Sequence, residues 1–187
     1  NASYIVSYKN SYLDKTSNLF YNYVGENQLP YSFSDLYTKL SLNSTSGSFL
    51  KLFYFDYNDL VDFPNTTTYD WGSNGFGGKF LLVPQSSKNI IDGSFAYSKY
   101  NIEQIEQDAR PRSSGIDGFN LGLNFTYFFP KAKLKYGMEL NGFKTAFQIY
   151  NQVNRKISQE NNTTELAAFV NYSTKVKNRF IFEPGIR

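Results

Sequence analysis

The sequence predicts an all-β fold in which antiparallel strands run up and down. The first reason lies in residues 118–129, GFNLGLNFTYFF, where bulky apolar residues alternate with small or polar ones. Successive side chains of a strand point to opposite faces, so Leu121, Leu123 and Phe125 share an apolar face and Asn124 lies on the other. A run of this length exceeds the roughly 5–6 residues usual in globular strands, and it suits a tilted strand that crosses a bilayer.

The second reason is the repeat of this alternation after a turn at Pro130. In residues 133–140, KLKYGMEL, Leu134 shares one face with Met138, while Lys135 lies on the other. In a β-sandwich the apolar face would be buried, and in a membrane barrel it would meet lipid while the charged face lines a wet lumen. The alternation is identical in both folds, so strand length and the lengths of the connections must decide between them.

Composition is the third reason. The chain has 187 residues, enough for one sizeable domain, and 19% of them are aromatic, which favours strands. No apolar run approaches the roughly 18–20 residues of a membrane helix, so any membrane crossing is expected to use a barrel. The net charge of +3 comes without a basic cluster, which argues against nucleic acid. The absence of Cys and His removes thiolate chemistry, the usual general base and the commonest transition-metal ligand. Separately from that absence, we expect no enzyme activity, no cofactor and no metal site.

Nine strand-like runs are expected, each rich in aromatic and β-branched residues and bounded by Gly, Pro, Asn or Ser. In chain order they span residues 2–9, 33–42, 48–57, 75–83, 90–100, 116–129, 133–147, 165–176 and 180–187. The other five prolines fall in connections, but Pro184 interrupts the last run. Either that run begins later or its proline sits at a bulge.

The connections are expected to alternate in length. The short ones are residues 43–47, 84–89, 130–132 and 177–179, and the long polar ones are residues 10–32, 58–74, 101–115 and 148–164. Short periplasmic turns alternating with longer extracellular loops are typical of outer-membrane barrels. The first strand is therefore expected to run outward.

The alternation also predicts which side chains face the lumen. Outward residues are expected at Leu36, Leu40, Phe95 and Tyr97, and inward ones at Asp35, Tyr37, Ser94, Ala96 and Ser98. In residues 48–57 the parity is ambiguous, and we place Phe53 and Phe55 on lipid with Lys51 extending toward the periplasmic rim. The lumen-facing residues expected to wet the wall and contact a plug are Lys39, Lys135, Glu139 and Asn141.

Three motifs carry possible chemistry. Residues 75–79, GFGGK, lack the spacing of a phosphate loop and are expected to start a strand. A second motif is a cluster of possible oxygen ligands, which comprises Asp56, Asn58, Asp59 and Asp62. It lacks the glycine and the glutamate that a calcium-binding loop needs at fixed positions, so a solvated loop is favoured over a cation site. The third motif is a charged stretch, which comprises Glu103, Glu106, Asp108, Arg110 and Arg112. It is expected to be a solvated loop, and the alternative is that its arginines contact a ligand or lipopolysaccharide.

Aromatic residues are also expected at the outer strand ends. Tyr12, Tyr69 and Trp71 are placed there by the boundaries given above. An aromatic girdle at the membrane interface is the first interpretation, and stacking against a ligand is the second. The candidate ligand-contact residues are therefore Trp71, Arg110 and Arg112.

Several segments resemble the TonB-dependent outer-membrane receptors. Residues 3–14, SYIVSYKNSYLD, resemble an outward strand and its loop start, and residues 33–59 resemble a strand–turn–strand pair of that family. Residues 165–187 resemble a later hairpin with a PG-[LI]-R signature, here Pro184-Gly185-Ile186-Arg187. The resemblance implies a barrel of about 22 strands around a plug domain. Residues 1–187 would then be a partial barrel domain, an internal fragment without the plug and the remaining strands.

The resemblance implies part of a TonB-dependent transporter in the bacterial outer membrane that imports a scarce solute, such as a siderophore, a vitamin or an oligosaccharide. Its partners would be outer-membrane lipid, the plug domain of the same protein, the TonB complex through the missing parts, and a small solute. Two alternatives stay open. One is a complete small outer-membrane barrel with a structural or adhesive role, and the other is a soluble glycan-binding β-sandwich.

Overall fold

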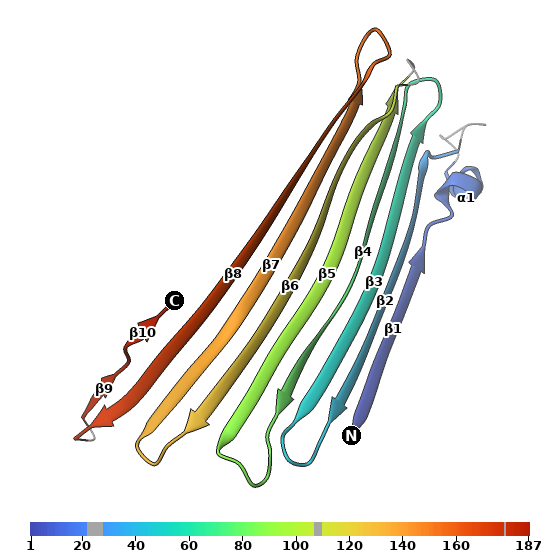
Figure 1. The fold of residues 1–187 in the computed structure, drawn as a ribbon. Coiled ribbons are helices and arrows are strands. Elements are labelled where there is room, and N and C mark those ends of the chain that lie inside the picture. The colour runs from blue at the N-terminus through green and yellow to red at the C-terminus, as the bar shows by residue number, and fades with distance from the viewer. Residues whose placement is uncertain (22–27, 107–109, 178) are drawn as a thin grey trace.

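The computed structural model describes residues 1–21, 28–106, 110–177 and 179–187, and it confirms an all-β chain with up-and-down antiparallel strands. Each strand pairs with its neighbours in sequence, from β1 to β8, as Figure 1 shows. The elements are β1 (Ala2–Asn10), α1 (Leu13–Phe20), β2 (Tyr31–Asn43), β3 (Phe49–Phe63), β4 (Thr67–Leu82), β5 (Asn89–Glu106), β6 (Arg112–Phe128), β7 (Ala132–Tyr150), β8 (Lys156–Val176), β9 (Phe180–Phe182) and β10 (Gly185–Ile186). The nine expected runs are all present, because β9 and β10 together form the ninth.

Most of the connections expected to be long are strand instead. β3 continues to Phe63 and β4 begins at Thr67, so residues 58–74 are largely a hairpin. Residues 101–106 and 112–115, and most of residues 148–164, likewise extend the neighbouring strands. The expectation of loops there is wrong because Thr, Asn, Gln and Tyr continue the hydrogen-bonded ladder, although their polarity resembles that of loops. Only the connection between β1 and β2 stays long.

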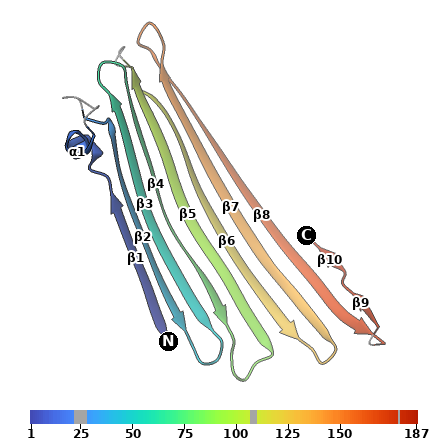
Figure 2. The same cartoon turned by 180° about the vertical axis from the view of Figure 1, so that it is seen from behind.

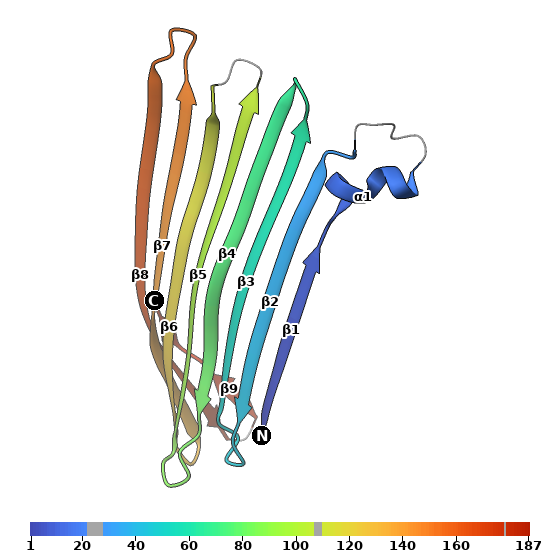
Figure 3. The same cartoon turned by 90° about the vertical axis from the view of Figure 1, so that its right-hand side faces the viewer.

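That connection contains the helix α1, which lies beside the upper ends of β1 and β2 (Figure 3). The hydroxyl of Ser17 is fully buried and accepts a hydrogen bond from the backbone N–H of Leu29 at 2.7 Å. This bond ties the helix to the segment that leads into β2. Among the described residues, no helix is long and apolar enough to span a membrane.

Pro184 separates β9 from β10 without changing their register on β8. Phe182 lies opposite Thr174, and Gly185 lies opposite Asn171, so the two short strands continue one alignment. The carbonyl of Pro184 still accepts a hydrogen bond from the N–H of Tyr172 at 2.9 Å. Both expected explanations are therefore wrong, because the run begins at Phe180 and keeps one register on both sides of the proline. Since Tyr172 and Pro184 form a hydrogen-bonded pair, the missing N–H of Pro184 removes the reciprocal ladder bond to β8, which agrees with the break between β9 and β10.

Phe53 and Phe55 lie on the same face as Lys39, not on the apolar face where we expect them. Their rings lie over glycines of β4. A Cβ added at Gly77 would come within 2.8 Å of the Phe53 ring, and one added at Gly75 within 2.8 Å of the Phe55 ring. Residues 48–57 are apolar at both parities, so their own pattern does not select a face. The face is decided by the space that Gly75 and Gly77 of β4 leave for the two rings.

The sheet is a single layer. Figures 1 and 2, which view it from opposite sides, show no element lying across either broad face of the described chain. The described residues include no buried hydrophobic side chain, and Leu121, Met138 and Leu166 are 47%, 54% and 73% exposed. Cross-strand pairs hold the sheet together, and its apolar side chains are left to contact whatever surrounds it.

Candidate functional site: two faces that exchange polarity

The strand register assigns every strand residue to one of two faces. Directly opposed residues of an antiparallel pair point to the same side. We call the side that carries Leu121 face 1 and the side that carries Asn120 face 2. The terms upper and lower refer to Figure 1, in which α1 lies at the upper end.

Face 1 carries a continuous apolar belt across the lower part of the sheet. One row of directly paired residues from β1 to β8 reads Tyr4, Leu40, Leu52, Gly78, Phe95, Leu121, Leu140 and Leu166. The next lower row reads Ala2, Leu42, Leu50, Phe80, Gly93, Leu123, Met138 and Ala168. On β6 the belt runs from Phe119 to Tyr127, nine residues that include five outward side chains. No charged residue occurs in either row.

The belt ends upward at an aromatic row followed by a charged one. The aromatic row reads Val6, Thr38, Tyr54, Phe76, Tyr97, Phe119, Gly142 and Thr164. The row above it reads Tyr8, Leu36, Asp56, Asn74, Lys99, Asp117, Lys144 and Asn162. The rings of Phe76 and Tyr97 lie 5.8 Å apart, and the Tyr54 hydroxyl donates to Asp56 at 3.2 Å. The change from apolar to charged takes place within one row.

Face 2 carries most of the polar side chains at the height of the belt, although Phe53 and Phe49 also lie on it. It carries the four residues expected to line a lumen, with Lys39 on β2 and Lys135, Glu139 and Asn141 on β7, five strands away. The side chains there form several cross-strand bonds: Asn120 donates to Asn141 at 2.5 Å, and Arg187 pairs with Glu139 at 3.1 Å. That this face lines a lumen stays a prediction.

The partition of the other predicted residues between the two sides agrees with the alternation. The register places Ser94, Ala96 and Ser98 on face 2, and Phe95 with Tyr97 on face 1. The same holds for β2, whose face-2 residues include Asp35 and Tyr37 and whose face-1 residues include Leu36 and Leu40.

Above the belt the two faces exchange polarity, and face 2 becomes aromatic. We call this surface the aromatic patch; it comprises Tyr31, Phe33, Tyr57, Val61, Tyr69, Trp71, Tyr100, Ile102 and Phe147. Trp71 lies directly between Asp59 on β3 and Ile102 on β5. The Tyr57 hydroxyl donates to Asp59 at 2.8 Å, so a carboxylate is held beside the indole.

Trp71 and Tyr69 lie on the face opposite the apolar belt, and their interpretation as a membrane-interface girdle stays a prediction. Both lie within β4 on face 2. On face 1, the aromatic row lies at the belt's upper edge. Tyr12, the third expected member, directly precedes α1.

The arginines proposed as ligand contacts are engaged at the upper end of the sheet. Arg112 forms an ion pair with Glu106, which joins the ends of β5 and β6. A guanidinium nitrogen of Arg110 donates to the carbonyl of Gln152 at 3.0 Å, and so links two neighbouring connections. Arg112 shares face 2 with Trp71 but is two strands away, so the structure does not bring the three residues into one site. Asp108 lies outside the described residues.

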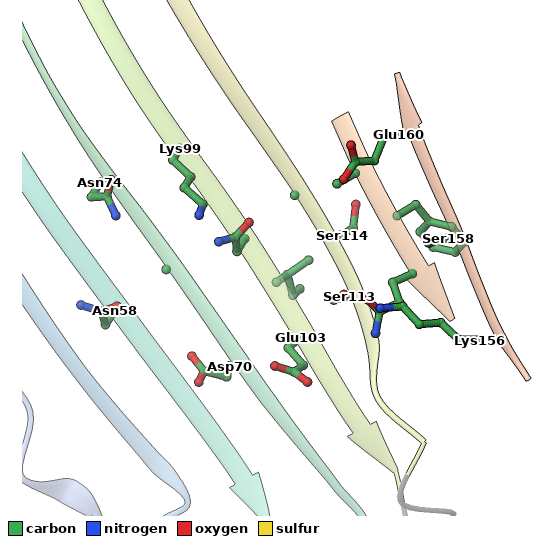
Figure 4. A pocket seen from close by; sticks show the side chains of 17 residues that line it. Asn58, Asp70, Asn74, Lys99, Glu103, Ser113, Ser114, Lys156, Ser158 and Glu160 are labelled. Atoms are coloured by element: carbon green, nitrogen blue, oxygen red, sulfur yellow. The ribbon is translucent and has the colours of Figure 1, made fainter. Parts of the chain in front are cut away.

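Face 1 above the belt contains a polar groove of about 580 Å³ that crosses six strands, from β3 to β8 (Figure 4). Its polar lining residues are Asn58, Asp70, Asn74, Lys99, Asn101, Glu103, Ser113, Gln148, Lys156, Ser158 and Glu160. Asp70 and Glu103 lie directly opposite each other on β4 and β5. Sequence reasoning missed this groove because its residues were assigned to loops.

The expected cation cluster is divided between the faces. Asp56, Asn58 and Asp62 lie on face 1 of β3, whereas Asp59 lies on face 2. The described residues contain no group of three or more carboxylate, imidazole or thiolate side chains suited to a metal ion. The GFGGK motif belongs to a strand, as expected, but it does not start one, because β4 begins at Thr67.

The exchange of polarity does leave a signal in the sequence. On β5 the large side chains of Phe95 and Tyr97 occupy odd positions, and those of Tyr100 and Ile102 occupy even ones; Ile90 and Ile105 depart from this pattern. On β7 the apolar side chains switch from even to odd between Leu140 and Phe143. The switch occurs at nearly the same height on β5 and β7, which flank β6, and this becomes evident only when the register is known.

Comparisons with known proteins add little to this geometry. No family model matches the chain, and no curated protein sequence matches it. Among solved structures, a double mutant of the hemophore receptor HasR of Serratia marcescens, in complex with its hemophore HasA and heme, is similar with a TM-score of 0.36 and 9% identity. The match covers 94% of this chain and 38% of that chain, so this chain spans well under half of that receptor's length. A likeness of this size concerns the fold and says nothing about solute or partners.

Proposed function

We propose that the chain forms part of a TonB-dependent transporter barrel in the bacterial outer membrane, which imports a scarce solute such as a siderophore, a vitamin or an oligosaccharide. The observation that carries the membrane assignment is the belt on face 1. On β6 it is nine residues long, which agrees with the about 9–11 residues that a tilted strand needs to cross a bilayer. Its aromatic upper row corresponds to the interface girdle of such barrels.

The opposite face supports a wet lumen at the same depth. Lys39, Lys135 and Glu139 lie behind the belt, where a soluble sandwich could equally place polar residues. A sandwich, however, would need a second sheet over the belt, and the described residues supply none. In the proposed barrel, lipid instead contacts the apolar side chains of the belt. The polar side chains behind it contact water and the plug domain of the same protein.

The open sheet supports a barrel larger than these strands. Within the described residues β1 pairs only with β2, and β9 and β10 pair only with β8, so both edges are free. An unpaired edge in lipid costs several kcal/mol for each unsatisfied backbone group. Further strands would satisfy both edges, and we place the elements that contact the TonB complex in those other parts of the protein. A complete small barrel would instead require β1 to pair with β9 and β10.

The aromatic patch is the proposed contact surface for the solute. It lies on the inner face, above the belt, where a solute would pass before entering the lumen. Trp71 offers an indole face, and the adjacent Asp59 carboxylate, which accepts from Tyr57, offers a polar anchor. Arg112 at the upper end of the same face is a second candidate contact.

Uptake measurements test the proposal directly. A strain that lacks the gene is supplied with iron only as ferric siderophores, with cobalamin as the only vitamin source, or with oligosaccharides as the only carbon. The full-length protein should restore growth on one of these sources, and a protonophore should abolish the uptake that it supports. Trp71→Ala should reduce uptake at low solute concentration, whereas Trp71→Phe should retain most of it. Uptake that survives the protonophore would indicate a passive barrel instead.

A further inference from the structure

The polar groove on face 1 is separate from the proposed path of the solute. Most of its lining residues lie on face 1, whereas the aromatic patch lies on face 2 of the same strands; Ile102 and Phe147 of the patch also border the groove. The groove begins one row above the aromatic row of the belt, with Lys99 and Asn74 at its lower end. In a membrane-embedded barrel it would therefore open outward, at the level of the lipid head groups.

The floor of the groove is shaped by two glycines that accommodate asparagine side chains. A Cβ at Gly72 would come within 2.9 Å of the Asn58 amide oxygen, and one at Gly115 would collide with the amide oxygen of Asn101. Both asparagine side chains therefore lie across the floor. Asn58 donates to Asp56 at 2.7 Å, which fixes its amide plane. Larger residues at the glycine positions would displace these amides.

Two carboxylates face each other in the upper part of the groove. Asp70 and Glu103 are direct cross-strand partners, and no cationic side chain of the described chain forms an ion pair with either (Figure 4). Like charges in this position repel each other. A ligand that donates hydrogen bonds to both carboxylates would relieve this repulsion without bringing a charge of its own.

The charge balance of the lining points to a neutral ligand. Glu160 is already paired with Lys144 at 3.1 Å, and the remaining two carboxylates are balanced by Lys99 and Lys156. A strongly anionic or cationic ligand would therefore find no excess of opposite charge. Amide, carboxylate, ammonium and hydroxyl groups instead offer donors and acceptors for a compound with many hydroxyl groups.

We propose that this groove binds a neutral saccharide chain. A volume of about 580 Å³ is within the range of small-molecule sites and accommodates a short stretch of sugar units. The sugar could be the head group of a membrane glycolipid or a free oligosaccharide, and both present the same hydroxyl chemistry. The outward-facing geometry rests on the proposed membrane orientation, but the binding does not depend on import.

Binding to the purified full-length protein tests the proposal. The protein is placed in phosphatidylcholine nanodiscs with or without digalactosyl diacylglycerol, and glycolipid retention is measured by native mass spectrometry. Separately, neutral hexasaccharides of glucose, galactose or mannose are titrated calorimetrically. We expect saturable binding of at least one probe. Binding of the glycolipid alone identifies a lipid source, and binding of a free hexasaccharide identifies a soluble one.

Two variants locate the binding in the groove. Glu103→Gln keeps the side-chain volume and removes a charged acceptor, so it should weaken binding by roughly tenfold. Ser113→Tyr, directly opposite Glu103, should fill the groove and abolish binding. The matched control is Gln104→Ala, which lies on the same strand but on face 2 and should leave binding unchanged. Binding to none of the probes, or equal binding by all variants, would overturn the proposal, whether or not the protein transports a solute.

Discussion

An arginine placed in the middle of the belt should destabilise the protein in a way that depends on face and depth. Leu123 lies at the centre of the nine belt residues of β6, with Gly93 and Met138 directly opposite. Leu123→Arg would therefore place its charge close to the bilayer midplane, where an arginine costs about 2–4 kcal/mol. We expect this loss in the free energy of unfolding of the full-length protein in lipid.

Two other positions of the same strand supply the controls. Asn120→Arg lies on face 2 and loses the hydrogen bond to Asn141, which contributes about 1 kcal/mol. Ser113→Arg lies on face 1 but ten residues above Leu123, beyond the belt, and should change stability by less than about 0.5 kcal/mol. The belt variant should therefore be less stable than the face-2 variant by about 1–3 kcal/mol, a difference obtained by combining the two costs.

Equilibrium unfolding in phospholipid vesicles measures all three variants. The protein is titrated with guanidinium chloride and followed by the circular dichroism of its strands. If Leu123→Arg and Asn120→Arg had equal costs, or the reverse order, the assignment of face 1 to lipid would be wrong. If Ser113→Arg cost as much as Leu123→Arg, the upper limit of the belt would be wrong.

Three further outcomes are expected. In these 187 Cys-free residues, a cysteine at Asn65 in the β3–β4 turn should react with a membrane-impermeant maleimide on intact cells, and one at Lys131 should not; the reverse pattern would invert the orientation. Gly77→Ala should lower the free energy of unfolding by about 1–3 kcal/mol because the new methyl group overlaps the Phe53 ring and the backbone carbonyl of Phe95. Adding Phe53→Leu should restore part of that loss, and no recovery would mean that the ring is not the obstacle. Arg187→Gln should change stability by less than about 1 kcal/mol, because its ion pair with β7 is largely exposed; a larger loss in chemical unfolding would indicate a pair shielded from water.

The sequence predicts the face of each side chain correctly in strands where only one parity is clearly apolar. Residues 118–129 and 133–140 placed Leu121 and Met138 on one face, and the register agrees. For residues 48–57 the predicted faces of Phe53 and Phe55 are wrong, because both parities of this segment are apolar. Glycines of the neighbouring strand decide which face the two rings occupy. That information is not local, and a single strand does not contain it.

The candidate site was harder to predict than the fold. Glu103 and Trp71 were assigned to loops because polar and aromatic residues between strands usually mark connections. In the structure they belong to long strands whose upper parts reverse the polarity of the lower ones. Asn124 illustrates the limit of pattern: its small polar side chain predicted a wet position, yet one amide oxygen is buried and its amide nitrogen donates to Asp92 at 2.8 Å.

The common height at which the strands reverse polarity has a consequence for assembly. In an ordinary alternating strand, a slip of the register by one residue moves every side chain to the wrong face. A slip by two residues returns each side chain to a face of the right polarity, so it costs little. Here a two-residue slip of β5 would move Lys99 into the aromatic row, next to Phe76 and Phe119. The reversal of polarity along β5 therefore specifies its register against the neighbouring strands. Insertions or deletions of two residues within a strand should be rejected as strictly as those of one, whereas the turns should tolerate both.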